Sequence, residues 1–353
     1  MFNLTGTTLG KYHVIERIGR GGMAEVYKGT HPKLGSQVAI KVLYSHLSEE
    51  EGFLARFERE AQAVAALQHP HLVRVFDYES TDELSYMIMD FIDGGTLKQK
   101  IQGLSRSGAY MSYREAFRIF RQVAEAIDYA HGEGMIHRDI KSANILLDKG
   151  GNAFLTDFGI ARIISHTQFT ATGALLGTPM YMSPEQCQGE KVTSLSDIYS
   201  LGIVLFEMAT GSVPFETETP LSVIHKHIYE PMPGPREFRP DIPQALENVI
   251  MKSLAKDPAN RYQTALEMLR ALVEALPDEL EAYTILSITH RDETRAIKQE
   301  EPQKERLDQT EAHVDIGERQ TEAILEPLEM PVPKDAVSTP TFKPEPLGEE
   351  PAS

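Results

Sequence analysis

Two short segments of this chain carry the side chains best suited to chemistry. Residues 137–144 bring the carboxylate of Asp139, the ammonium of Lys141 and the carboxamide of Asn144 into one polar loop. An Asp-Phe-Gly triplet begins farther along, at Asp157. A carboxylate that orients a hydroxyl, a cation that neutralises developing charge and oxygen ligands for Mg²⁺ are the groups that phosphoryl transfer needs. The order and spacing of the two segments therefore favour this chemistry.

The two segments resemble the catalytic loop and the metal-binding triplet of protein kinases, and the chain is similar to the bacterial, eukaryotic-like Ser/Thr protein kinases. The resemblance implies that Asp139 orients the acceptor hydroxyl and that Lys141 neutralises charge. It also implies that Asn144 and Asp157 hold Mg²⁺, or Mn²⁺ in its place, beside ATP, and that the substrates are proteins with Ser or Thr acceptors. Lys141 disfavours a tyrosine kinase.

Two other classes of protein share the fold that this resemblance implies. A pseudokinase, which only binds partners, would have lost a member of the catalytic set, and that set is complete. A small-molecule phosphotransferase would lack the Gly-Thr-Pro-Met-Tyr-Met-Ser-Pro-Glu segment, residues 177–185, which forms a groove for protein substrates in the family. The sequence therefore favours an active protein kinase.

A glycine cluster at residues 19–26 lies between two expected strands and resembles the loop that covers the phosphates of ATP. Glycines let the backbone approach phosphate oxygens, and the amides act as donors. Lys41 ends an apolar Val-Ala-Ile-Lys strand and is expected to align the α- and β-phosphates, while Met89 is expected beside the adenine. The nucleotide-binding set implied by the resemblance comprises Ile18, Gly19, Arg20, Gly21, Gly22, Met23, Ala24, Glu25, Val26, Ala39, Lys41, Met89, Asp90 and Ile92.

The expected ion-pair partner of Lys41 lies on an amphipathic helix at residues 53–67, whose apolar residues recur at helical spacing. Glu60 fits the register of the family and is the preferred partner. Glu58 on the same helix is its rival. A solvated helix glutamate is the alternative for both.

The segment from Asp157 to Glu185 resembles an activation loop. Thr170 and Thr172 match the autophosphorylated pair of bacterial receptor-type kinases. Arg138, next to the expected base, would receive the phosphate through charge-assisted contacts.

The resemblance assigns structural roles to further residues. Thr178 would hydrogen-bond the catalytic Asp and Lys, and Asp197 would brace the backbone of the catalytic loop. Glu185 and Arg261 would form a buried ion pair that anchors the helical part.

Two departures from common family patterns bear on the substrate. Thr96 and Ala143 stand where basophilic members carry acidic residues, so a preference for an upstream arginine is not expected. Ile160 follows the Asp-Phe-Gly triplet, and a β-branched residue there accompanies a preference for threonine acceptors in the family.

The periodicity predicts an α+β fold in which strands precede helices. This layout agrees with the bilobal kinase fold, with an antiparallel sheet and one helix in the first lobe and mainly helices in the second. Strands are expected at 12–18, 26–27, 38–43, 73–78 and 84–89, and further helices at 113–130, 197–209, 245–253 and 264–276. The expected divisions are an extension at 1–11, a kinase domain at 12–276 with lobes at 12–90 and 94–276, and a tail at 277–353.

The charge of the chain is concentrated in this tail. Residues 277–353 hold 19 acidic and 8 basic residues, which accounts for −11 of the net charge of −17. Few aromatic residues accompany this charge, so the tail is expected to be disordered. No basic patch argues for nucleic-acid binding.

The sequence also predicts the compartment. No signal peptide or membrane span is apparent, and the lone Cys187 rules out an internal disulfide, which suits a reducing compartment. A cytoplasmic protein is therefore expected.

Three similar pieces recur in the tail, around Thr294, Thr310 and Thr321. Once phosphorylated, such threonines resemble ligands of forkhead-associated domains, which would make such a domain a partner. Chance within a Thr- and Glu-rich linker is the alternative. The family resemblance adds a homodimer through the strand-rich lobe as a further expectation.

Overall fold

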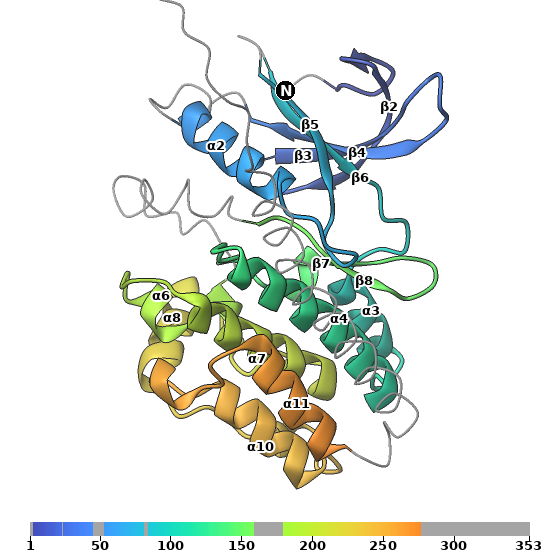
Figure 1. Ribbon diagram of the computed structural model, residues 1–353. Helices are drawn as coiled ribbons and strands as arrows, with labels where there is room; N and C mark the ends of the chain where they lie inside the picture. Colours follow the sequence, from blue (N-terminus) through green and yellow to red (C-terminus); the bar gives the residue numbers. More distant parts are fainter. Residues whose placement is uncertain (1–2, 23, 45–52, 81–83, 159–178, 277–353) are drawn as a thin grey trace, which may run out of the picture. The chain divides into compact units, whose positions relative to one another are not determined.

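The computed structural model describes residues 3–22, 24–44, 53–80, 84–158 and 179–276, and these belong to one unit (Figure 1). Its sheet has the strand order β1-β2-β3-β4-β6-β5, and all neighbouring strands are antiparallel. The strands are β1 (Thr8–Leu9), β2 (Tyr12–Arg20), β3 (Ala24–Thr30), β4 (Gln37–Leu43), β5 (Val75–Ser80) and β6 (Ser85–Asp90). Residues 8 and 9, expected to belong to an extension, thus add a short edge strand.

The central strand β4 is apolar on both faces, and alternation along it decides where Lys41 points. Val38, Ile40 and Val42 belong to one apolar cluster of the sheet. Ala39 and Leu43 belong to the other, together with residues of α2 (Phe53–Ala65). Because successive side chains of a strand point to opposite faces, Lys41 shares the face that α2 covers.

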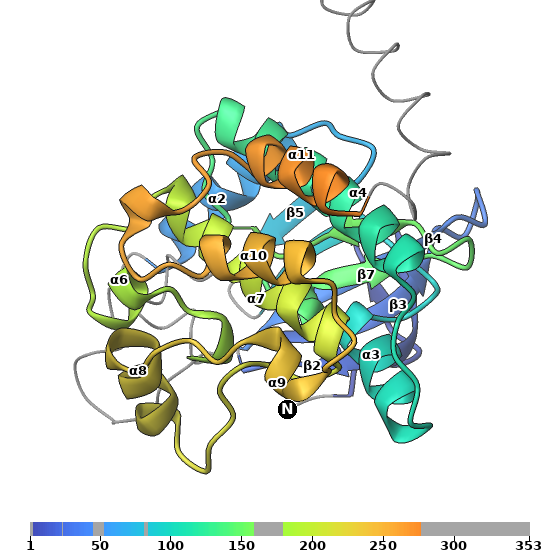
Figure 2. The same ribbon diagram turned by 90° about the horizontal axis from the view of Figure 1, so that it is seen from below.

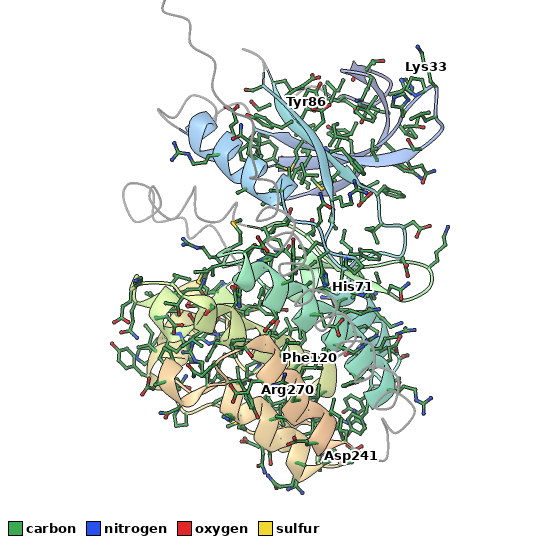
Figure 3. All side chains as sticks on the ribbon, in the orientation of Figure 1. Lys33, His71, Tyr86, Phe120, Asp241 and Arg270 are labelled. Carbon is green, nitrogen blue, oxygen red and sulfur yellow. The ribbon has the colours of Figure 1, made fainter. Side chains whose placement is uncertain are left out.

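The remaining helices build the second part of the unit around α7 (Ser194–Thr210), which is buried along most of its length. Figure 2 shows α10 (Gln244–Ser253) packed over α7. Phe120 of α4 (Tyr113–Gly132) is buried among these helices (Figure 3). The others are α3 (Leu97–Arg106), α6 (Pro184–Cys187), α8 (Pro220–Tyr229), α9 (Pro235–Phe238) and α11 (Ala265–Ala275).

A small ribbon of β7 (Ile145–Leu147) and β8 (Ala153–Leu155) connects the sheet-bearing part to the helices. Leu155 donates its backbone N–H to the His71 carbonyl at 2.9 Å, and Gly94 donates to the Leu147 carbonyl at 2.8 Å. A Cβ at position 94 would lie 2.4 Å from that carbonyl oxygen, so only glycine fits there. Because Ile145 pairs with Leu155, the catalytic loop that precedes β7 and the Asp-Phe-Gly triplet that follows β8 lie at the same end of this ribbon.

The expected α+β layout is confirmed, and the predicted strands and helices agree with the described ones to within a few residues. The short β7–β8 ribbon and the helices α3, α6, α8 and α9 were not predicted. Within the described residues, no helix combines the length and apolarity needed to span a bilayer.

Candidate active site

The catalytic loop holds three of the predicted site residues in direct contact. Lys141 Nζ donates to Asp139 Oδ2 at 2.7 Å, and Asn144 Nδ2 donates to the same oxygen at 3.0 Å. Asn144 Nδ2 also donates to the Asp139 main-chain carbonyl at 2.8 Å. Asp139 is one-third exposed, with 33% of its side-chain surface accessible, so a hydroxyl from another molecule can reach it. The cluster is therefore a carboxylate held in place by two donors.

Asp197, at the start of α7, accepts hydrogen bonds from the backbone of this loop. Its Oδ1 accepts from the Arg138 N–H at 2.8 Å, and its Oδ2 accepts from the His137 N–H at 2.8 Å. His131 Nε2 lies 2.8 Å from Oδ2 as well. Arg138 adopts a left-handed φ of 69°, which is costly for a residue with a side chain. The arrangement agrees with the bracing role expected for Asp197.

His137 connects the catalytic loop to the Asp-Phe-Gly triplet, a role that sequence reasoning missed. Its Nε2 lies 3.0 Å from the Thr156 carbonyl oxygen, and its ring centre lies 4.4 Å from that of Phe158. Burial lowers the pKa of His137, so the ring is neutral near pH 7. Its position directly before Arg138 and Asp139 was the signal that could have identified it.

Lys41 and Asp157 meet from opposite sides of the site. Lys41 Nζ lies 2.6 Å from Asp157 Oδ1, and this contact joins β4 to the segment just after β8. Burial favours the neutral acid, but the attraction and hydrogen bond of Lys41 prevail and lower the pKa of Asp157. Asp157, like Arg138, has a positive φ, here 67°. A fixed ammonium thus faces a fixed carboxylate where the phosphate and metal sites were expected.

The expected pairing of Lys41 with Glu60 lies outside the described residues, because the side chain of Glu60 is not described. The same holds for Met23, for the activation-loop residues Thr170 and Thr172, for Ile160 and for Thr178. These remain expectations from sequence.

Most of the nucleotide-binding set predicted from sequence lies on β2, β3, β4 and the end of β6, whereas Gly21 and Gly22 lie between β2 and β3 and Ile92 follows β6. Val26 pairs with Lys41, and Ala39 pairs with Met89, so these residues form one patch of the sheet. The side chain of Glu25 instead turns to its neighbours, where it accepts from Arg17 at 2.9 Å and from Tyr27 at 2.6 Å. Any contact that Glu25 makes with a nucleotide would therefore involve its backbone.

The last predicted pair, Glu185 and Arg261, is a buried, two-pronged ion pair. The two carboxylate oxygens each lie 2.8 Å from a guanidinium nitrogen. Burial favours neutral Glu185, but Arg261 prevails and keeps the pKa of Glu185 below its ordinary value. The pair lies between α6 and the loop before α11, as its expected anchoring role requires.

Two oxygen-bearing side chains of the site fit a hard divalent cation. Both donor hydrogens of Asn144 face Asp139, which leaves the carboxamide oxygen to act as a ligand. Asp157 supplies a carboxylate that is charged at neutral pH. Such oxygen ligands, together with phosphates and water, suit Mg²⁺.

Comparison with known proteins gives the same picture. The protein kinase domain family matches residues 12–272. The chain is 44% identical over 260 residues to a probable serine/threonine-protein kinase, PknB, of Lactococcus lactis, covering 73% of this chain and 41% of that protein. It is 42% identical over 259 residues to the serine/threonine-protein kinase PrkC of Bacillus subtilis, covering 73% and 39%. The chain thus spans about two fifths of the length of these curated relatives.

A solved kinase-domain structure of PknI from Mycobacterium tuberculosis superimposes with a TM-score of 0.63 at 30% identity, covering 78% of this chain and 99% of that one. The matched family, the relatives and this structure all indicate a protein kinase domain. The chain therefore belongs to the protein kinase family, among the eukaryotic-like Ser/Thr kinases of bacteria.

Proposed function

We propose that this chain is an ATP-dependent Ser/Thr protein kinase that uses Mg²⁺. The observation that carries the proposal is the catalytic-loop cluster, in which Lys141 and Asn144 both donate to one oxygen of Asp139. These contacts leave the carboxylate accessible and fix its orientation. An oriented carboxylate is what a hydroxyl needs at the moment of attack on phosphorus.

In the proposed reaction, Asp139 orients the acceptor hydroxyl and takes its proton. The hydroxyl oxygen bonds to the γ-phosphorus of ATP, the bond from that phosphorus to the bridging oxygen breaks, and ADP leaves. Lys141, 2.7 Å from Asp139, would offset the charge on the transferred group. General-base positioning of this kind contributes on the order of 10²–10⁴ in rate.

The nucleotide would lie between the sheet and the β7–β8 ribbon. Asn144 and Asp157 would hold the metal, and Lys41 would bind phosphate in place of its present partner Asp157. Mg²⁺ bound there would offset the charge that develops on the phosphate oxygens. Mn²⁺ accepts the same hard oxygen ligands and could take the place of Mg²⁺.

Activation would follow phosphorylation of Thr170 or Thr172. Each phosphate adds roughly −1.5 to −2 charge and can accept about one to three charge-assisted bonds. Arg138 follows buried His137 and precedes the base, so a phosphate bound by its guanidinium would act close to the reacting groups.

The acceptor would be threonine rather than serine, because the branched side chain of Ile160 can pack on the extra methyl group. One methyl in an apolar contact is worth about 1 kcal/mol, so the preference is several-fold at most.

Partners of the tail would be proteins that read phosphothreonine. The tethered domain would modify Thr294, Thr310 or Thr321 at high local concentration, and a forkhead-associated domain would then bind. Chance recurrence in the tail remains the competing explanation. The proposal also includes the pairing of two copies through the sheet-bearing part. It places the protein in the cytoplasm.

Incubation of the purified chain with radiolabelled ATP, Mg²⁺ and a protein acceptor tests the proposal, with phosphosite mapping to follow. Label on Ser or Thr in the wild type, and none with Lys41→Met, is the expected result. Label confined to tyrosine, or no label at all, would refute it. Mapping shows at the same time whether the activation-loop and tail threonines are modified.

A further inference from the structure

Gln186, within α6, contacts both the start of its own helix and the catalytic loop. Its Oε1 accepts from the backbone N–H of Ser183 at 3.0 Å and from Ser183 Oγ at 3.2 Å. Its Nε2 donates to the main-chain carbonyl of Arg138 at 2.9 Å. One half-buried amide thus joins the end of the segment expected to bind the protein substrate to the residue before Asp139.

The partners of this amide allow only one orientation. The backbone N–H of Ser183 can only donate, and the carbonyl of Arg138 can only accept. Oε1 must therefore face Ser183, and Nε2 must face Arg138. A glutamate at position 186 would serve the helix cap equally well, but it has no donor for Arg138 at neutral pH.

The peptide units that Gln186 helps to hold are strained. Arg138 has a φ of 69°, a conformation that persists only where the surroundings enforce it. Asp197 holds the N–H of Arg138 at 2.8 Å, and Gln186 holds its carbonyl. The two contacts fix both sides of the residue whose carbonyl carbon is bonded to the nitrogen of Asp139.

We infer that Gln186 is a positioning residue for phosphoryl transfer, which it serves by holding the Arg138 carbonyl so that Asp139 keeps its orientation. The inference rests on the proposed kinase function. The resemblance to known kinases did not assign Gln186 any role, and its second contact shows that it is more than a helix cap.

The substitution Gln186→Glu separates the two contacts of the amide. It keeps the acceptor for Ser183 and removes the donor to Arg138. We expect kcat for an acceptor peptide to fall about tenfold, which corresponds to about 1.4 kcal/mol, with KM for ATP changed less than about twofold. The midpoint of urea unfolding should fall only slightly, because the cap is retained and only the contact with Arg138 is lost.

Gln188→Glu is the matched control, because it adds the same charge two residues farther on, at an exposed position. It should keep the wild-type kcat. Gln186→Met removes the donor without adding charge, and it should lower both kcat and the unfolding midpoint. Hydrogen exchange of peptides covering residues 135–145 should be faster in Gln186→Glu than in Gln188→Glu.

Each outcome decides the matter. If wild type and Gln188→Glu transfer phosphate and Gln186→Glu matches them in kcat and exchange, the inference fails and the proposed function stands. A loss of kcat that only parallels a loss of stability would reduce Gln186 to a helix cap and also overturn the inference. If none of the proteins transfers phosphate, the proposed function fails, and the positioning role fails with it.

Discussion

Replacing Glu185 with glutamine would leave a positive charge buried without its counter-charge. The side chain of Arg261 is 0% exposed and that of Glu185 is 7% exposed. A guanidinium has five N–H donors, and here each has a partner: both oxygens of Glu185 and the carbonyls of Leu195, Ala255 and Lys256. Glutamine would place an amide N–H group against one of these donors. Arg261 cannot lose its proton to relieve the conflict.

The expected cost is large because the cation cannot reach water. Breaking a buried ion pair by removing one partner costs about 3–5 kcal/mol. For a domain of this size, each kcal/mol lowers the melting temperature by about 2–4 °C, so Glu185→Gln should melt about 6–20 °C below the wild type. The chain has no tryptophan, so unfolding is best followed by far-UV circular dichroism.

Asp241→Asn provides a matched control. Asp241 also makes a two-pronged pair, with both contacts to Arg239 at 3.0 Å, but its side chain is 68% exposed. Figure 3 labels Asp241, which lies at the bottom of that view, away from α6. Solvent reaches the carboxylate and screens this pair, and Arg239, 12% exposed, keeps its contact with the Ala209 carbonyl, so Asp241→Asn should lower the melting temperature much less than Glu185→Gln. Equal losses in the two variants would refute the argument from burial.

The pH dependence of the same pair gives a second check. The pKa of Glu185 is lower in the folded protein than in the unfolded chain. Its contribution to stability is therefore fully present above the ordinary glutamate pKa of about 4.3, and it is lost as the pH falls through the lower folded value. The stability difference between wild type and Glu185→Gln should be constant from pH 7 to about 5 and should close in stronger acid.

Three further predictions concern activity. Asp197→Asn sets an amide N–H group against a backbone N–H of the catalytic loop, and the lost hydrogen bond costs about 1–3 kcal/mol. If that cost falls on the transition state, kcat in a steady-state peptide assay should drop roughly 5- to 150-fold. An unchanged kcat would contradict the bracing role. Thr170→Ala/Thr172→Ala should lower the activity of the autophosphorylated protein sharply, and full activity with no loop phosphate found by mass spectrometry would refute activation through these sites. Ile160→Phe should shift the ratio of threonine to serine phosphorylation several-fold toward serine in a matched peptide pair, and an unchanged ratio would remove Ile160 as the cause.

The elements of the fold that could be predicted from the sequence are those with a long run of apolar residues of one structural preference. The helix α7 was recognisable because nearly every residue from Asp197 to Ala209 is apolar and buried. Strand β4 was recognisable from its run of Val, Ala and Ile. The ribbon β7–β8 was missed because three-residue strands carry no periodicity, and its hydrogen bonds to His71 and Gly94 are long-range.

In the site, too, local patterns could be predicted from the residues alone and long-range contacts could not. Asp139, Lys141 and Asn144 could be predicted because they lie close in sequence and their spacing is itself the signal. The contact of Lys41 with Asp157 spans 116 residues, and motif resemblance had placed Lys41 with a different carboxylate. His137 and Gln186 were missed because their roles depend on backbone carbonyls, which leave no trace in residue types.

The central claim is that Asp139 orients the acceptor hydroxyl, and Asp139→Asn tests it most directly. The variant keeps the volume of the side chain and the packing of the loop, so its circular dichroism spectrum and ATP binding should match those of the wild type. Its kcat for transfer of the γ-phosphate to an acceptor peptide should fall by on the order of 10²–10⁴. Wild-type turnover by folded, ATP-binding Asp139→Asn protein would contradict the account.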